Sequence, residues 1–340
     1  MQLLSVKRLM LIAMVCGLIY WLSGEYALDA QAQSLPTPVS SLATGESLTH
    51  VAWSPDGQRI AIAGSSGIRI YNTDLQQLYY IQDNNKSFNT VDWSPDSLML
   101  ATASREDDNV KIWSRNIMTE TYSNVATLPL NRPIAIAAKW SADGAKLATL
   151  SASDPPKFEG DLVGMIEIWD TANWTVLQEL PSFGNITSTI IWSPDSLAVG
   201  GSGNCLSSPG WDCPNTFERG IYIFDVETGD FITGFNGITL ILRGDADWHP
   251  NGRLLIANSE LLDIYDTNFI KSASFDPDEG SEIKLVEWHP DGRRLAFSDN
   301  SFLFHIADGD TGSVITLLST PVSGFSWSPN GQYIVSVSQQ

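Results

Sequence analysis

The residue types that most often carry out chemistry are few in this chain, and their spacing matches no known site. Only four histidines occur among 340 residues. His249 and His289 each lie between a Trp and a Pro, where a turn-forming role is expected, and a metal site built on this pair would lack neighbouring ligands. His305 takes an apolar strand position, and His50 precedes the first of the repeats described below. We therefore expect no motif-borne catalytic residue, no metal and no cofactor.

Two further observations bear on catalysis and metal binding. The sequence contains no G-x-S-x-G elbow, P-loop or H-E-x-x-H motif. The segment DPDEGSE, residues 276–282, groups carboxylates that would suit a hard cation such as calcium. Its spacing matches no calcium-binding loop, so the segment predicts an acidic surface loop instead.

Cysteine placement suggests an oxidising compartment. Cys205 and Cys213 lie eight residues apart in the sequence CLSSPGWDC, and the third cysteine, Cys16, lies near the N-terminus. Two thiols in one Pro/Gly/Ser-rich loop of an exported protein predict a disulfide, which would contribute roughly 2–3 kcal/mol on the chain-entropy model. Two unpaired cysteines are the alternative. Zinc is disfavoured because no His lies near either residue.

The N-terminal sequence has the pattern of a secretory signal peptide. Lys7 and Arg8 precede an uncharged apolar run, residues 9–22, and an Ala-Gln-Ala sequence ends at Ala32. The run is short for a membrane span of about 20 residues, so residues 1–32 are interpreted as a signal peptide cleaved after Ala32. An uncleaved anchor helix formed by residues 9–22 is the alternative. A lipid anchor on Cys16 is a weaker one, because the residues before it lack the usual small side chain. All three alternatives predict an extracytoplasmic location.

The charge balance limits the partners. The chain carries 19 basic and 39 acidic residues, a net charge of −20. Such a chain repels phosphate backbones, so nucleic acid is an unsuitable partner, and a membrane would be met only through an uncleaved N-terminal segment. Cationic partners fit the charge better. High solubility of a large β protein is the simpler explanation of the same charge.

A tryptophan repeat organises the rest of the chain. Sequences such as VAWSPDG, VDWSPDS, VEWHPDG and FSWSPNG recur at spacings of 40, 47, 52, 56, 40 and 39 residues. The repeat has a period of about 40 residues, and the longer intervals contain insertions. The repeated tryptophans are Trp53, Trp93, Trp140, Trp192, Trp248, Trp288 and Trp327.

Each repeat has the composition of four short antiparallel strands. An alternating run precedes the Trp, and Ser-Pro-Asp-Gly then favours a tight turn. Runs such as RIAIAGS, VKIWS and DFITGF follow, separated by polar turns. Four strands in about 40 residues make one propeller blade. Because a blade is apolar on both faces, the repeated Trp is expected to pack between blades, where burial of 150–250 Å² contributes at most about 4–6 kcal/mol. We therefore predict an all-β, seven-bladed propeller over residues 33–340, preceded by the N-terminal signal or anchor helix.

These motifs are similar to those of the bacterial WD-repeat (WD40) propeller family. The WD dipeptide occurs at Trp169-Asp170, with IFD, IYD and IYN at the matching places, and the likeness covers residues 44–340. The WHPDGRRLAFS unit also resembles the repeats of TolB-type propellers. The Gly-His pair that usually opens WD40 repeats is absent, so the family's buried His-Asp network is expected to be absent too. The resemblance implies a monomeric protein-interaction scaffold.

The last repeat contains fewer strand-like runs than a complete four-stranded blade needs. That unit has two runs, SGFSWSP and QYIVSVS, before the sequence ends. In this family the N-terminal segment usually supplies the outer strand of the last blade, and PVSSLA, residues 38–43, is placed to do so. The expectation is therefore either a three-stranded seventh blade or a truncated sequence.

Two insertions mark the candidate binding face. They occupy the same connection of neighbouring repeats, at residues 154–164 and 204–220. Their aromatic and charged residues are candidate partner contacts; packing of the loops on themselves is the alternative. The expected function is that of an exported, non-enzymatic scaffold that binds a protein or another macromolecule through its loop faces. A lactonase- or hydrolase-like propeller enzyme with a central site is the alternative, which convergent Asp, Glu, His or Arg side chains would favour. The candidate contacts are Phe158, Trp211, Phe217 and Arg219.

Overall fold

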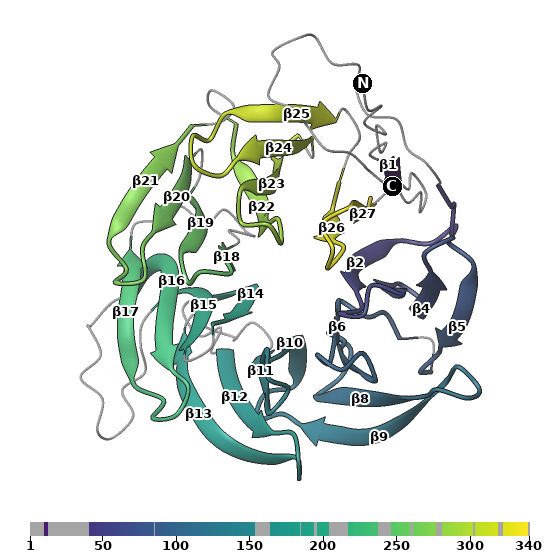
Figure 1. Ribbon diagram of the computed structural model, residues 1–340. Helices are drawn as coiled ribbons and strands as arrows, with labels where there is room; N and C mark the ends of the chain where they lie inside the picture. Colours follow the sequence, from purple (N-terminus) through teal and green to yellow (C-terminus); the bar gives the residue numbers. More distant parts are fainter. Residues whose placement is uncertain are drawn as a thin grey trace, which may run out of the picture.

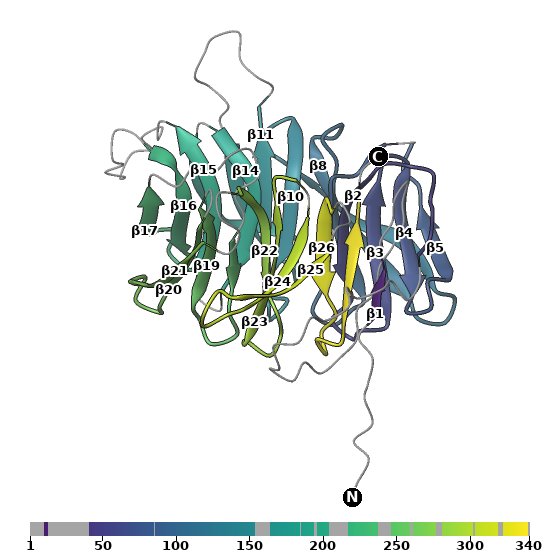
Figure 2. The same ribbon diagram turned by 90° about the horizontal axis from the view of Figure 1, so that it is seen from above.

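The chain folds into a ring of small antiparallel sheets around a central axis (Figure 1). The computed structural model describes residues 10–12 and 41–338, apart from 85, 154–163, 184, 194–195, 204–216, 237–245, 259–260, 277–280, 302 and 319–321. Viewed at right angles to the ring, the strands run along its axis (Figure 2). Turns and loops therefore form its two faces.

Six blades of four strands each make up most of the ring. Blade one contains β2 (Leu48–Trp53), β3 (Arg59–Gly64), β4 (Gly67–Asn72) and β5 (Gln77–Ile81). Blade two contains β6 (Thr90–Trp93), β7 (Met99–Ala103), β8 (Asn109–Asn116) and β9 (Thr121–Pro129). Blade three contains β10 (Ile134–Trp140), β11 (Lys146–Ala152), β12 (Gly164–Asp170) and β13 (Thr175–Phe183).

The second half of the ring follows the same order. Blade four contains β14 (Asn185–Trp192), β15 (Ser196–Gly203), β16 (Phe217–Asp225) and β17 (Phe231–Asn236). Blade five contains β18 (Ala246–Trp248), β19 (Leu254–Asn258), β20 (Leu261–Tyr265) and β21 (Lys271–Phe275). Blade six contains β22 (Ile283–Trp288), β23 (Arg294–Asp299), β24 (Phe304–Asp308) and β25 (Val314–Leu318).

The predicted number of blades is wrong, because the structure has six four-stranded blades rather than seven. The last repeat supplies two antiparallel strands, β26 (Gly324–Trp327) and β27 (Tyr333–Val337). A third strand, β1 (Met10–Ile12), pairs with β27 in parallel, and we call these three strands the closing sheet. β26 and β27 pack against β2 of blade one, so the ring returns to its start.

The expected N-terminal helix and the expected closing strand are also wrong where the structure describes them. Within residues 9–22, Met10–Ile12 form a strand, and the described part of the chain contains no helix. A short apolar run does not by itself distinguish a helix from a strand, and the edge of β27 offers this one backbone partners. Residues 41–43 of the PVSSLA segment form no strand, and 38–40 lie outside the described residues.

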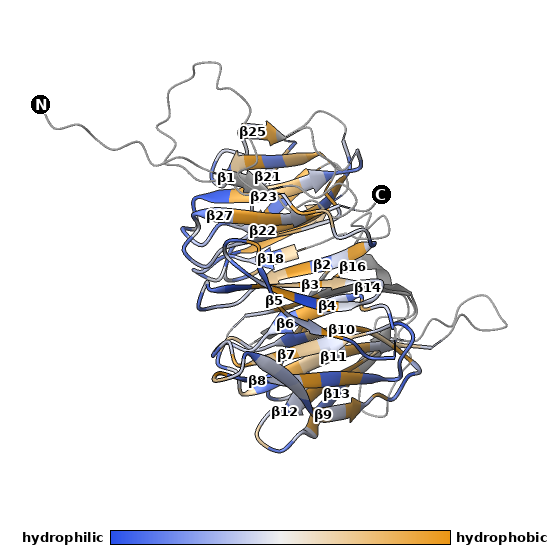
Figure 3. Cartoon of the chain, turned by 90° about the vertical axis from the view of Figure 1, so that its right-hand side faces the viewer, coloured by the Kyte–Doolittle hydropathy of each residue, from blue (hydrophilic) through white to orange (hydrophobic). Residues whose placement is uncertain are grey.

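The core lies between the blades rather than within any one of them. One cluster joins Ile68 and Ile70 of blade one to Val91 and Trp93 of blade two, and similar clusters recur around the ring. Figure 3 shows apolar residues along the strands and polar residues at the turns. Because each sheet is apolar on both faces, neighbouring sheets bury one another.

Every four-stranded blade carries a bulge at the same place. The outer strand has one extra residue opposite the end of the third strand, next to that strand's aromatic or equivalent residue. In blade one the partners are Ile70 with Tyr79 and Tyr71 with Gln77, so Leu78 is the extra residue. The equivalent residues in blades two to six are Val125, Leu177, Ile232, Ser272 and Ile315.

Candidate functional site

The repeated tryptophans end the innermost strand of each repeat. Trp53, Trp93, Trp140, Trp288 and Trp327 are 8 % exposed or less. Trp192 and Trp248 are partly buried against the apolar clusters beside them. The residue just before each Trp lies on the same inner strand and points to the opposite side. These preceding residues therefore meet the next blade near the ring axis.

Three of the preceding residues are acidic, and each accepts a hydrogen bond from the next blade. The Asp92 carboxylate accepts the backbone N–H of Trp140 at 2.8 Å. Asp247 accepts the backbone N–H of Trp288 at 2.7 Å and that of its own neighbour, Trp248, at 2.9 Å. Glu287 accepts the backbone N–H of Trp327 at 3.1 Å. These carboxylates link the inner strands of successive sheets.

A second kind of link appears where the preceding residue is not acidic. The indole Nε1 of Trp93 donates to the Ala52 carbonyl at 3.2 Å. The indole Nε1 of Trp192 donates to the Lys139 carbonyl at 2.9 Å. Indole links thus join blades one to two and three to four, whereas carboxylate links join two to three, five to six, and six to the closing sheet.

Lys139 supplies the positive charge among these acidic residues. Its Nζ lies 2.7 Å from the Asp92 carboxylate, and its side chain is 39 % exposed, so the ammonium is crowded by protein but still meets water. Burial by itself lowers the pKa of Lys139, but the charges of Asp92, Glu287 and Asp247 outweigh it and raise that pKa. Lys139 therefore stays protonated, and three carboxylates on different blades act on one ammonium.

His50 is the titratable group whose pKa is displaced furthest near this axis. Burial, followed by the charge of Lys139, lowers the pKa of His50 to about 3, against a smaller opposing hydrogen bond with the backbone of Val91. The imidazole is therefore neutral at physiological pH. His50 precedes the first repeat Trp by three residues, as Thr90 does in blade two.

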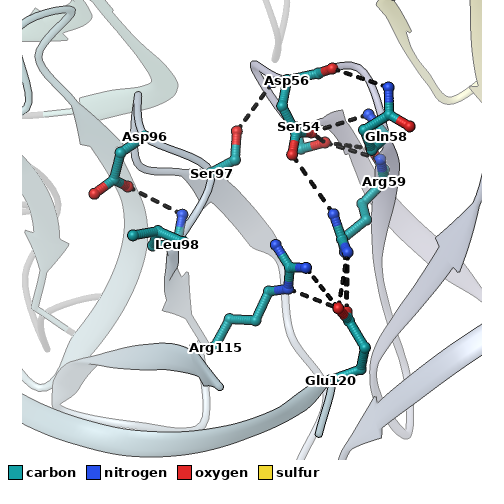
Figure 4. A network of polar contacts seen from close by, with 9 residues as sticks. All are labelled: Ser54, Asp56, Gln58, Arg59, Asp96, Ser97, Leu98, Arg115 and Glu120. Atoms are coloured by element: carbon teal, nitrogen blue, oxygen red, sulfur yellow. Dashed lines mark hydrogen bonds and ion pairs between the residues drawn. The ribbon is translucent and has the colours of Figure 1, made fainter. Parts of the chain in front are cut away.

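The turn after each Trp is closed by its own side chains. In blade one the Ser54 hydroxyl donates to Asp56 at 2.5 Å and accepts the Arg59 backbone N–H at 2.9 Å. Ser97 takes the place of the turn Gly in blade two with a φ of 61°, and its hydroxyl accepts the Asp56 backbone N–H at 3.0 Å. Figure 4 shows this contact between neighbouring turns.

The two histidines of the Trp-His-Pro turns form the turn and also bridge blades. His289 Nδ1 accepts the Asp291 backbone N–H at 3.0 Å, which leaves the Nε2 proton to reach the Gly331 carbonyl of the closing sheet at 2.8 Å. Its ring meets the Trp327 ring edge-on, with centroids 4.5 Å apart. His249 makes the equivalent contact with Gly292 of blade six at 2.7 Å. Serine at this position is too short to make such a bridge.

The WD dipeptide has two separate structural roles. Trp169 Nε1 donates to the Thr149 hydroxyl at 2.9 Å, and that hydroxyl donates to the buried Glu167 at 3.0 Å. Burial raises the pKa of Glu167. Asp170 instead caps the following turn by accepting the backbone N–H of Ala172 at 3.0 Å.

A buried His-Asp pair lies within blade six, although the Gly-His pair on which the family's network depends is absent from the sequence. His305 Nε2 lies 3.1 Å from Asp299 in blade six, and both side chains are 3 % exposed or less. The His305 ring stacks on Phe297 with centroids 4.4 Å apart. Asp299 also accepts two backbone N–H groups of the following turn, Ser301 and Leu303, so the pair fixes a turn within one blade.

The remaining candidate residues fall largely outside the described part of the chain. Phe158, Trp211, Cys205, Cys213 and Ala32 lie in segments that the structure does not describe. Phe217 and Arg219 lie at the start of β16.

Within the described residues, no group of three or more His, Cys, Asp or Glu side chains is arranged to hold a metal ion. The same residues include no helix that is long and apolar enough to cross a membrane. The sequence analysis missed the inner carboxylates. Their position directly before a repeated Trp is the signal that could have found them.

Comparison with known families identifies the repeat. Residues 36–72 and 75–114 match the family model described as WD domain, G-beta repeat. A search of curated proteins found no match. The two matches cover the first two repeats, and the ring of four-stranded blades extends the same architecture through β25. The chain is therefore a β-propeller whose first two blades match WD40 repeats.

Proposed function

We propose that the chain is an exported scaffold that binds a protein partner through the face carrying the connections between the second and third strands of its blades. Propellers of the WD40 class serve in general as platforms for protein interactions, although fold alone does not dictate function. The observation that supports this role most directly is the use of the inner carboxylates. Asp92, Asp247 and Glu287 accept hydrogen bonds from backbone N–H groups of neighbouring sheets. These bonds stiffen the ring, so these carboxylates have a structural role.

The two faces of the ring differ in a way that favours this assignment. Antiparallel order places the Trp-Ser-Pro turns and the turns between third and fourth strands on one face, where short turns are closed by their own hydrogen bonds. The opposite face carries the described ends of β11 and β15, at which the two long insertions of the sequence begin. Variable loops on a rigid scaffold are the usual location of binding residues.

Affinity purification of the tagged chain from its source cells tests the binding face. The Trp211→Ala, Phe217→Ala double variant is expected to lose a partner that the wild type retains. Ile270→Ala, on the opposite face and 64 % exposed, is the matched control. An unchanged set of partners in the double variant removes the insertions from the proposal.

Export is tested separately by N-terminal sequencing of the chain recovered from the envelope and the medium. Cleavage after Ala32 leaves Gln33 as the first residue. An intact N-terminus on a chain that stays in the membrane fraction would support the anchor instead. An intact N-terminus on a cytoplasmic chain would refute export.

A further inference from the structure

The turn between β8 and β9 exposes two large apolar side chains that the fold does not use. Ile117 is 62 % exposed and Met118 is 94 % exposed. They adjoin one another at the tip of the hairpin in blade two, on the face opposite the long connections. Single exposed apolar residues are normal on protein surfaces, whereas adjacent ones at a protruding tip suggest a contact.

In three other blades an apolar residue of the equivalent turn packs inward, although Ile270 of blade five is also exposed. Just before the outer strand, Leu75, Trp174 and Phe269 each have a φ near 60°, as Glu120 does in blade two. Trp174 meets Trp140 edge-on at 5.9 Å, and Phe269 meets Trp248 at 6.2 Å. Leu75 is 9 % exposed. In blade two this inward position carries a carboxylate, and the apolar side chains of the turn face water instead.

The exposed tip is held in one conformation from both sides. Arg115 donates to Glu120 at 2.6 and 3.1 Å, and Arg59 of blade one donates to the same carboxylate at 3.0–3.2 Å (Figure 4). The Asn116 side chain caps the turn by accepting the Met118 backbone N–H at 2.9 Å. A tip ordered before binding loses little conformational entropy when it docks.

The charges around the tip determine which partner fits. The Arg59 and Arg115 side chains are 12 % and 8 % exposed, whereas Asp56 and Glu120 are 37 % and 34 % exposed. The carboxylates are therefore more exposed than the arginines paired with them, so the charged groups that face water next to the tip are mainly acidic. Attraction between opposite charges favours a basic partner, and the net charge of −20 acts in the same direction.

We infer that Ile117 and Met118 form an anchor that inserts into an apolar pocket, rimmed by basic side chains, on a protein partner. An unbranched Met adapts to irregular pockets, and a few buried anchors carry most of the affinity of an interface. This site lies opposite the loop face of the proposed function, so either can fail without the other.

The experiment compares the full wild-type chain with the Ile117→Ser, Met118→Ser double variant and with Ile270→Ser. Ile270 is 64 % exposed at the corresponding turn of blade five. Ile270→Ser therefore replaces an exposed apolar side chain by the same polar one, but away from the tip. Each chain captures proteins from an extract of the source cells, and each captured protein is then purified and titrated directly. Equal thermal midpoints for the three chains establish that folding is unchanged.

We expect to capture a basic protein. Its affinity for the double variant should be about tenfold or more lower than for the wild type, and its affinity for the control should be less than about twofold lower. Its binding should also weaken as salt rises from roughly 50 to 300 mM. The absence of any protein that distinguishes the double variant from the control overturns the inference. So does a distinguishing partner that is acidic or insensitive to salt.

Two further outcomes would show that the tip contacts something other than a basic protein, and either would overturn the inference. Self-association of the wild type that the double variant loses, measured by sedimentation, would place a second copy on the tip. Binding to phosphatidylcholine vesicles that depends on Met118 would place a lipid surface there.

Discussion

Asp247, on the inner strand of blade five, accepts the backbone N–H of Trp288 in blade six at 2.7 Å. The same carboxylate accepts the backbone N–H of Trp248 at 2.9 Å, so one side chain fixes the ends of two neighbouring inner strands. We expect Asp247→Ala to lower the free energy of unfolding by about 1–3 kcal/mol, because two backbone donors lose their acceptor. Urea unfolding measures this change. Asp74→Ala, at an exposed turn, serves as the control and should be nearly neutral.

The close approach of His289 to Gly331 predicts an energetic coupling. A Cβ on Gly331 would lie 2.4 Å from the His289 ring, and Gly331 has a φ of 66°. We expect Gly331→Ala to destabilise the wild type by at least about 1 kcal/mol more than it destabilises the His289→Ser background, where the clash is gone and backbone strain remains. A double-mutant cycle in urea measures the difference. Simple additivity of the two changes would show that the ring contact carries no coupling.

Stability should depend on pH through His50. Its pKa is lowered to about 3 in the folded chain from 6.5 in the unfolded one, so between these values the unfolded state binds the extra proton. Stability should therefore fall as pH drops from about 6.5 towards 3, by less than about 1.4 kcal/mol per pH unit for this one group.

Comparison with His50→Gln isolates that contribution. Urea unfolding of the two chains between about pH 5 and 6.5 avoids most of the range in which unfolding lets carboxylates such as Asp291, whose pKa is lowered to about 2 in the folded chain, bind protons. The wild type should lose stability relative to the variant as the pH falls through this range. Parallel pH profiles would contradict a neutral His50 in the folded chain.

Glu120 should order the tip of its hairpin more than it stabilises the fold. The carboxylate is 34 % exposed, so its ion pairs with Arg59 and Arg115 are partly screened by water. We expect Glu120→Ala to cost less than about 1 kcal/mol in global stability but to speed hydrogen exchange of the amides at 116–121. Glu227→Ala, which removes a 74 % exposed carboxylate from a tip in blade four, should leave exchange at 116–121 unchanged.

The sequence predicted the local pattern of this fold well and its long-range completion poorly. Alternating runs and the Trp-Ser-Pro turn located most strands, because period and turn chemistry are local properties. How the ring closes is not local: β1 and β27 are more than 300 residues apart, and no periodicity links them. The last repeat showed that strands were lacking, but the parallel pairing of β1 with β27 could not be read from the repeats.

The site shows the same division between local and distant information. His289 was predicted to form its turn, which follows from its place before Pro290. Its bridge to Gly331 depends on the next sheet and was missed. The grouping of Lys139 with carboxylates from three blades was missed for the same reason, since the ring brings together residues that the sequence separates.

The extra residue on each outer strand has a consequence beyond the shape of the blade. The outer strands β5, β9, β13, β17, β21 and β25 are the rims of their sheets, where backbone donors and acceptors would otherwise face outward in an unbroken row. A bulge on each interrupts that row, so another chain finds no straight template along which to extend a sheet. We therefore expect these bulges to hinder edge-to-edge pairing of the rings, even though Val125, Leu177 and Ile232 are exposed beside them.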